Sequence, residues 1–294
     1  MTVLILGSGL DPFCALLEEE CARRCIPSVF LNEAELVGRL RVSWAPGDLA
    51  FPATLGTGPA ALRLAEVSGV FFRFAGALTF PAGFTVRDQQ YITSELVALF
   101  CALVQELPCP VVNRPRHELW FKGWIPESEL ASSSAPGTFQ FRKAIVTSDP
   151  DTATTFFREH GGMVFLPLSA PIPYPIRTQR DLHRLHRLMR TIPVRLVEAV
   201  EGEELDCYVV GPRTFVASQS GGDPPSVPDA IRGECVRLAA HLGLVFAQLR
   251  LLRGRGGEVF ALGMELYPTF PAQDIALASE LVGALTDELQ RDTR

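Results

Sequence analysis

The first 115 residues alternate between short apolar runs and longer amphipathic segments, and this alternation limits the fold more than any other feature of the sequence. Two segments, 11–24 and 86–107, repeat their apolar residues at the spacing of one helix face. The runs with a strand pattern are 3–7, 28–32, 68–74 and 110–115. Strands that alternate with helices favour an open, mainly parallel sheet, so we predict an N-terminal α/β domain over residues 1–115.

The turn after the first strand raises the possibility of a dinucleotide site. Gly7 and Gly9 match the first two glycines of the G-x-G-x-x-G pattern, but the third position is Pro12. We therefore interpret this segment as an ordinary strand-to-helix turn.

The character of the sequence changes after Trp120. A stretch rich in Ser, Pro and Gly at 127–139 is the best candidate for a boundary or a loop. Three closely spaced strands over 194–218 suggest an antiparallel sheet, and two more strands flank the turn at 253–257. A final helix is predicted over 275–291.

Composition excludes several classes of protein. A net charge of −6 argues against a nucleic-acid-binding surface. No apolar run approaches the roughly 20 residues of a membrane span, and the opening residues lack the basic region of a signal peptide. The seven cysteines include no C-x-x-C pair, which favours reduced thiols in a cytoplasmic protein.

The order of segments in the second half resembles the ATP-grasp superfamily. The residues EAVEGEELDCYVVGPRTFVA (198–217) resemble its hinge and following strands, and 242–268 resembles the strand pair that normally holds magnesium. PVVNRP (110–115) resembles the junction into the first ATP-binding subdomain. The likeness is greatest to ligases that modify ribosomal proteins and to those that cyclise microviridin-type peptides. It implies two α+β ATP-grasp-like subdomains, over 116–192 and 193–294, after the α/β domain.

The resemblance also implies a chemistry and a set of site residues. Such enzymes phosphorylate a carboxylate with ATP, and an amine or another nucleophile then displaces the phosphate, with magnesium neutralising the charge. The metal position that remains is Glu265. The positions that match nucleotide-binding ones are Lys122, Lys143, Glu198, Val200 and Glu204.

Several other positions depart from the family pattern. Arg250 stands where a metal-binding Asp is expected, and Tyr267 stands where an Asn is expected. Leu166 replaces the lysine of the phosphate-binding strand, and Asp206 replaces a basic residue after the hinge. The phosphate loop is replaced by SAPIPYP, whose prolines lack backbone donors. We expect Arg250 and Glu265 to lie side by side on adjacent strands and to pair, which would leave no magnesium site.

Two functions remain open. The first is a degenerate, non-catalytic relative that needs no cofactor and binds a peptide, a small metabolite or a catalytic partner protein. The second is an active ATP- and magnesium-dependent carboxylate–amine ligase in which Glu265, Lys122 and Lys143 survive and Glu204 contacts the ribose. Either could form a homo- or hetero-oligomer. The basic helix at 180–190 is either a solvated surface or a place for an acidic peptide.

Overall fold

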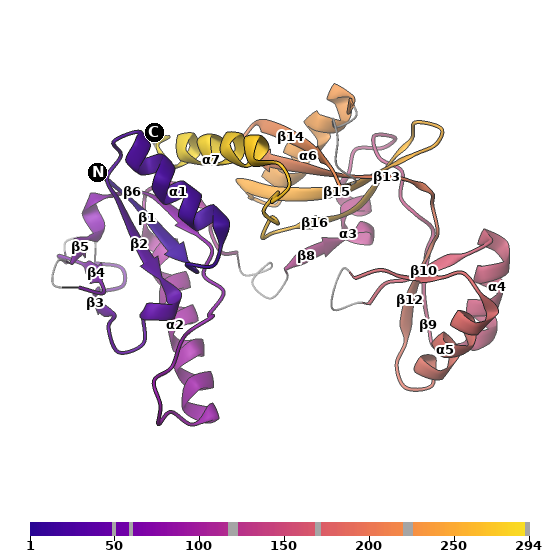
Figure 1. Ribbon diagram of the computed structural model, residues 1–294, viewed down its shortest axis with the longest axis horizontal. Coiled ribbons are helices and arrows are strands. Elements are labelled where there is room, and N and C mark those ends of the chain that lie inside the picture. The colour runs from indigo at the N-terminus through magenta and orange to yellow at the C-terminus, as the bar shows by residue number, and fades with distance from the viewer. Residues whose placement is uncertain (49–50, 59–60, 117–122, 168–171, 220–225, 292–294) are drawn as a thin grey trace.

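The structure is a computed structural model in which the chain forms an elongated molecule (Figure 1). It describes residues 1–48, 51–58, 61–116, 123–167, 172–219 and 226–291. The N-terminal part lies at one end, a large sheet in the middle and a smaller sheet with two helices at the other end.

The N-terminal part is built on a parallel sheet of order β2-β1-β6-β7. Its strands are β1 (Thr2–Gly7), β2 (Ser28–Asn32), β6 (Val67–Phe72) and β7 (Val111–Val112). On one face lies α1 (Pro12–Arg23), which starts at Asp11, whose side chain accepts a hydrogen bond from the backbone of Phe13. On the other face lies α2 (Val86–Glu106). The predicted α/β domain is therefore present.

A small antiparallel sheet lies beside this domain. It consists of β3 (Arg41–Ser43), β4 (Thr54–Gly56) and β5 (Leu62–Arg63), with short 3₁₀ turns at Glu33–Glu35 and Leu64–Glu66. Leu55 and Leu64 extend the apolar core under α2. This sheet therefore completes the cover of the parallel sheet on that side.

The central sheet is antiparallel, with order β14-β13-β15-β16-β8. Its strands are β8 (Trp124–Pro126), β13 (Gly202–Val210), β14 (Arg213–Ser218), β15 (Phe246–Gly254) and β16 (Val259–Glu265). One face packs on α3 (Glu127–Ser133) and α6 (Asp229–His241) through a large apolar core. The opposite face has two parts. The Val210–Phe246 end packs on α7 (Ile275–Leu289), and the remainder carries polar side chains.

The fourth sheet, called the small sheet below, has order β11-β10-β12-β9. Its strands are β9 (Ala144–Thr147), β10 (Met163–Phe165), β11 (Tyr174–Ile176) and β12 (Val194–Glu198). The helices α4 (Pro150–His160) and α5 (Gln179–Met189) cover one face. Asp149 caps the start of α4, and Gly161 ends it at a positive φ of 64°.

The assignment of strands to sheets differs from the sequence-based prediction in two places. The strands at 194–218 were expected to form one antiparallel sheet, but β12 joins the small sheet, whereas β13 and β14 join the large one. The intervening residues 199–201 carry the chain from one sheet to the other, so this short segment is the hinge. β8 and α3, which precede the small sheet in the chain, belong to the large sheet and its core.

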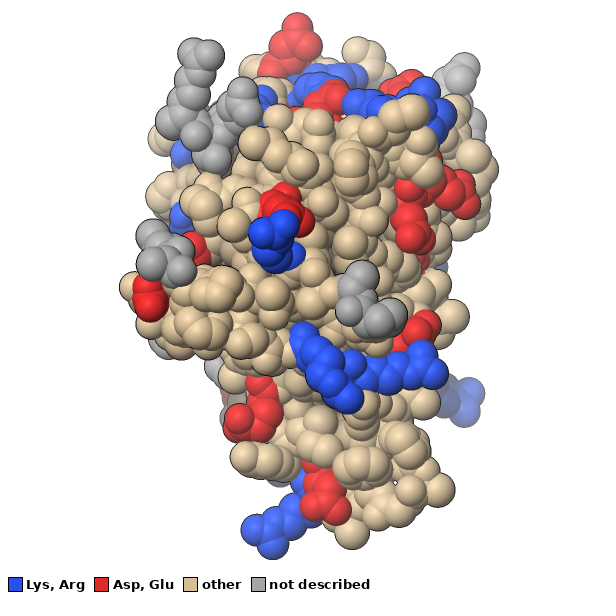
Figure 2. Space-filling view, turned by 90° about the vertical axis from the view of Figure 1, so that its left-hand side faces the viewer, with Lys and Arg blue, Asp and Glu red and all other residues tan. Residues whose placement is uncertain are grey.

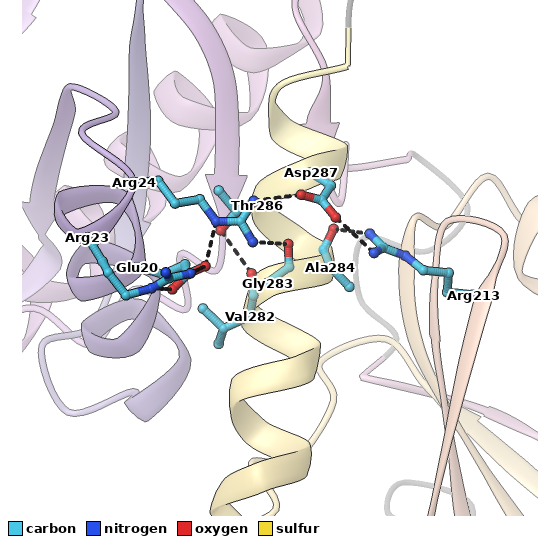
Figure 3. Close-up of polar contacts among 9 residues, drawn as sticks. All are labelled: Glu20, Arg23, Arg24, Arg213, Val282, Gly283, Ala284, Thr286 and Asp287. Carbon is cyan, nitrogen blue, oxygen red and sulfur yellow. Dashed lines mark hydrogen bonds and ion pairs between the residues drawn. The ribbon is translucent and has the colours of Figure 1, made fainter.

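The C-terminal helix α7 joins the N-terminal part to the large sheet. Its leucines share one apolar core with Ile5 and Phe13 on one side and Tyr208 on the other. Figure 3 shows Asp287 between two arginines: Arg24 after α1, at 2.6 Å, and Arg213 of β14, at 2.8 Å. These contacts tie the two parts into one unit.

Candidate functional site

The open face of the large sheet carries the candidate site. Along β13, Leu205, Cys207 and Val209 point into the core, so Glu204 and Asp206 point to the opposite face. This face also holds side chains from β15 and β16. It is where the sequence placed a metal site.

Cross-strand register brings four of the sequence-selected charges onto this face. Asp206 lies directly opposite Arg250, and one step along, Gln248 of β15 lies opposite Glu265 of β16. The Nη2 atom of Arg250 lies 3.2 Å from Oε2 of Glu204. The guanidinium of Arg250 therefore lies among the carboxylates of Glu204, Asp206 and Glu265.

Neighbouring polar side chains hold two of these carboxylates. Gln219 donates from Nε2 to Oδ1 of Asp206 at 3.1 Å. Thr269 donates from Oγ1 to Oε2 of Glu265 at 3.3 Å, and its backbone N–H donates to Gln248 at 2.6 Å. Gln219, Gln248 and Thr269 were not selected from the sequence, because only the register of the folded sheet shows which amides and hydroxyls face the acids.

Burial raises the pKa of Glu265. The positive charge of Arg250 and the hydrogen bond from Thr269 act in the opposite direction, while the nearby Asp206 adds to the rise. Glu265 therefore lies close enough to both Asp206 and Arg250 to interact with their charges.

The expected arrangement of Arg250 and Glu265 needs correction. They are not direct cross-strand partners, because Arg250 faces Gly263 and Glu265 faces Gln248. The two residues are therefore offset by two positions along the β15–β16 pair, and a register shift follows between Arg250 and Leu251. Arg250 and Glu265 are diagonal neighbours, and the ion pair at 3.2 Å joins Arg250 to Glu204.

This face does not fit a magnesium site of the expected kind. Magnesium needs several hard oxygen ligands around one point, and here a guanidinium lies among the oxygens. Within the described part of the chain, no three His, Cys, Asp or Glu side chains gather closely enough to hold a metal ion.

A cavity of about 980 Å³ lies at the hinge end of the same sheet. It is lined by residues 200–205, which run from the hinge into β13, by the Gly254–Gly257 turn and by Ser226–Pro228. Val200 and Glu204 thus line one cavity, and their part in nucleotide binding stays a prediction. Glu204 is the partner of Arg250, so an added ligand would compete with that ion pair.

The other predicted nucleotide residues lie elsewhere. Glu198 accepts the backbone N–H of Lys143 at 3.0 Å and lies 3.5 Å from Nδ1 of His160. Its carboxylate therefore serves contacts within the small sheet. The side chain of Lys143 is exposed, and Lys122 lies outside the described residues.

One buried arginine was missed in the sequence. Arg195 of β12 is only 8% exposed, and its backbone carbonyl accepts from the N–H of Leu166, the position where a lysine is expected. Among the described residues, the Nε and Nη2 atoms of Arg195 have no hydrogen-bond partner. The signal was present, since Arg195 is the one charged residue inside the apolar run VRLV.

Arg195 belongs to a buried polar group at the joint between the two sheets. Arg142 pairs with Glu127 of α3, and Glu127 also interacts with the charge of Arg195. Burial raises the pKa of Glu127, while its hydrogen bond to Arg142 acts to lower it. The group links the small sheet to the core of the large one.

No family model matches the sequence, and no curated protein matches it. Solved structures do match. The macrocyclase MdnC of Microcystis aeruginosa MRC, bound with the precursor peptide MdnA, superposes with a TM-score of 0.82 at 17% identity, over 98% of this chain and 100% of that one.

Two further structures agree with this match. A RiPP-associated ATP-grasp ligase of Chryseobacterium gregarium, in complex with ADP and a leader and core peptide, gives a TM-score of 0.79 at 14% identity, over 98% of this chain and 96% of that one. A RimK domain ATP-grasp protein of Sphaerobacter thermophilus gives a TM-score of 0.58 at 15% identity, over 99% of this chain and 100% of that one. The chain therefore has the ATP-grasp fold, an N-terminal α/β part followed by α+β parts. The bounds 116–192 and 193–294 stay a prediction, and β8 and α3, which fall in the first range, belong to the large sheet and its core.

Proposed function

We propose that this chain binds a peptide as a component of a modification or biosynthetic pathway and does not carry out magnesium-dependent phosphoryl transfer. The observation that carries the proposal is the position of Arg250, paired with Glu204 among the carboxylates of the open face. Charge neutralisation by the metal is a main term in phosphoryl transfer. Arg250, which stands in place of a metal-binding carboxylate, would repel the magnesium ion and so prevent this charge neutralisation.

Support for a peptide ligand comes from the structural neighbours. The Microcystis protein was solved with a precursor peptide and the Chryseobacterium protein with a leader and core peptide. Both match this chain over nearly its whole length, which supports a peptide as its ligand. A small metabolite or a catalytic partner protein would use the same cleft, as a monomer or within an oligomer.

Calorimetric titration with ATP, with and without Mg²⁺, tests the loss of phosphoryl transfer. We expect no magnesium-dependent binding to the native chain in the micromolar range. A double variant, Arg250→Asp with Asp206→Arg, restores the charge order of the family and should bind Mg-ATP more tightly than the native chain. Micromolar, magnesium-dependent ATP binding by the native chain would overturn the proposal.

One observation favours the alternative of an active carboxylate–amine ligase. Asp206 lies opposite Arg250, and Arg195 lies beside Leu166, so each missing charge has a counterpart on the adjacent strand. Relocated ligands would predict ADP release when the right carboxylate and amine are both present. That release should disappear in Glu265→Ala and persist in Glu258→Ala, which removes an exposed carboxylate at the β15–β16 turn.

A further inference from the structure

A second cavity lies at the start of β15, at the opposite end of this strand from the hinge cavity. Its volume is about 320 Å³, and it lies where β6 and β7 end next to the start of β15 and the residues after β16. Ligands of open parallel sheets commonly bind outside the carboxyl ends of the strands. This position alone makes the cavity a candidate binding site.

The wall of the cavity is apolar with a positive edge. Phe71, Phe74, Val97 and Leu266 supply apolar surface, and three arginines join them. Among the described residues that line it, none is Asp or Glu, in a chain whose net charge is −6. The lining therefore complements an apolar group that carries a negative charge.

The three arginines have different surroundings. Arg73 pairs with Asp11 and donates to the carbonyl of Pro268, and Arg114 donates to the carbonyls of Leu107 and Cys109 at 3.0 and 2.9 Å. These two arginines serve the fold.

Arg116 differs from both. It is exposed, and within the described residues it makes no hydrogen bond or ion pair. Its guanidinium lies over Gly243, where an added Cβ would come within 2.1 Å of the guanidinium carbon. Gly243, at a φ of +67°, thus leaves room for the arginine beside the cavity.

The thiol of Cys101 and the phenol of Tyr267, which also line the cavity, would not repel an anion. Burial raises the pKa of Cys101 to about 12, and burial also raises the pKa of Tyr267. The thiol and the phenol therefore stay neutral near pH 7. Tyr267, which stands where the family pattern expects an Asn metal ligand, lines this cavity.

We propose that this cavity binds a carboxylic acid with an aromatic or branched apolar body, whose carboxylate accepts hydrogen bonds from Arg116. Such an acid is either a free metabolite or the carboxyl terminus of a peptide. Cavities near 300 Å³ are at the small end of ligand sites, which suits one such group. The proposal is independent of whether ATP or magnesium binds on the open face.

Calorimetric titration with 3-phenylpropanoate and with its neutral amide tests this site. We expect the acid to bind at least about tenfold more tightly than the amide, since a hydrogen bond to a charged group contributes on that order. Arg116→Gln should remove this preference. Arg87→Gln, a matched loss of an exposed arginine on α2 away from the cavity, should retain it.

A second variant tests the cavity itself. Ala75 lines the cavity but is exposed, so Ala75→Trp should fill the cavity without disturbing the core and should abolish binding of acid and amide alike. Equal affinity for acid and amide, or unchanged binding in Arg116→Gln, would overturn the proposal. So would the absence of saturable binding at millimolar acid.

The same titration with N-acetyl-glycyl-phenylalanine, as acid and as amide, separates the two sources of the ligand. Tighter binding of the peptide acid than of 3-phenylpropanoate supports a peptide terminus, and the reverse order supports a free acid. If neither acid binds, this proposal fails, while the proposed loss of magnesium-dependent phosphoryl transfer is still tested separately by the Mg-ATP titration.

Discussion

Asn113 uses its whole side-chain amide to join β7 to the large sheet. Its Oδ1 accepts from the backbone N–H groups of Val245 and Phe246, both at 2.8 Å. Its Nδ2 donates to the carbonyls of Phe246 and Leu266 at 2.6 and 3.3 Å. Asn113 therefore bonds to the backbone at the start of β15 and just after the end of β16, two strands of another sheet.

Asn113→Ala should lower the free energy of unfolding by about 2–4 kcal/mol, because the substitution leaves partly buried backbone groups without partners. Urea denaturation measures the change. Gln90→Ala removes an exposed amide from α2 and should change stability by less than about 0.5 kcal/mol. Similar, small losses in both variants would contradict the role given to Asn113.

The raised pKa of Glu265 predicts a pH-dependent stability. The folded carboxyl holds its proton more tightly than the unfolded one, whose ordinary pKa is 4.5, so the folded state loses stability as the pH rises from there through the folded pKa. Glu265→Gln should remove this loss.

The variant's stability relative to the native chain should therefore increase between about pH 4 and about pH 7. Denaturation curves across that range test the point, with Glu258→Gln as the control at an exposed site. A difference between variant and native chain that does not change with pH would show that burial of Glu265 costs nothing.

At the scale of elements, most helices and strands could be predicted, because each depends on a local pattern. The caps Asp11, Asp149 and Gly161 fixed where α1 begins and where α4 begins and ends. Which strands pair could not be read locally. β12 and β13 are neighbours in sequence with similar apolar patterns, yet they belong to different sheets.

In the candidate site, too, the residues could be predicted but their pairing could not. The charged residues Glu204, Asp206, Arg250 and Glu265 were all visible in the sequence. Their geometry depends on the register between β15 and β16, and the polar partners Gln219 and Thr269 come from outside the strand pair. Apolar periodicity shows which face of a strand a residue lies on but not which residue of the next strand it faces, so the expectation that Arg250 lies directly opposite Glu265 was wrong.

The attachment of α7 through Asp287 gives a prediction at this scale (Figure 3). Burial alone would raise the pKa of Asp287, but hydrogen bonds from Arg24 and Arg213 hold it below its ordinary value. This stabilisation is present above the unfolded pKa of 3.8 and is lost as the pH falls through the folded one.

Asp287→Asn should lower stability by about 0.5–1 kcal/mol near pH 7, a modest effect because the carboxylate is partly exposed. The difference from the native chain should shrink below about pH 4. Glu280→Gln, an exposed carboxylate on the same helix, is the matched control and should change little. A loss that is equal at both pH values would contradict the ion-pair account.

At the scale of the whole molecule, charge is spread thinly over the face that Figure 2 shows: uncharged residues predominate there, and several of the small charged groups contain both acidic and basic side chains. No helix in the described ranges combines the length and the apolar character needed to cross a bilayer.

The β9–β12 sheet and the large sheet should differ in local stability. The core beneath α4 and α5 contains nine buried residues among those described, whereas the core under α3 and α6 contains twenty. Hydrogen exchange of the whole chain should therefore show amides of β10 and β12 opening at a lower free energy than those of β13 and β15. Equal protection across these four strands would mean that the sheets unfold as one unit.

The position of α7 has a consequence for how the chain is made. The parallel sheet is complete once β7 has been synthesised, but the helix that covers part of its face beside α1 begins only at Ile275. At translation rates of 5–20 residues per second, that face waits roughly 10–30 seconds for its cover. During this interval the nascent chain exposes Ile5 and other core residues, so the ribosome-bound protein is a natural substrate for chaperones.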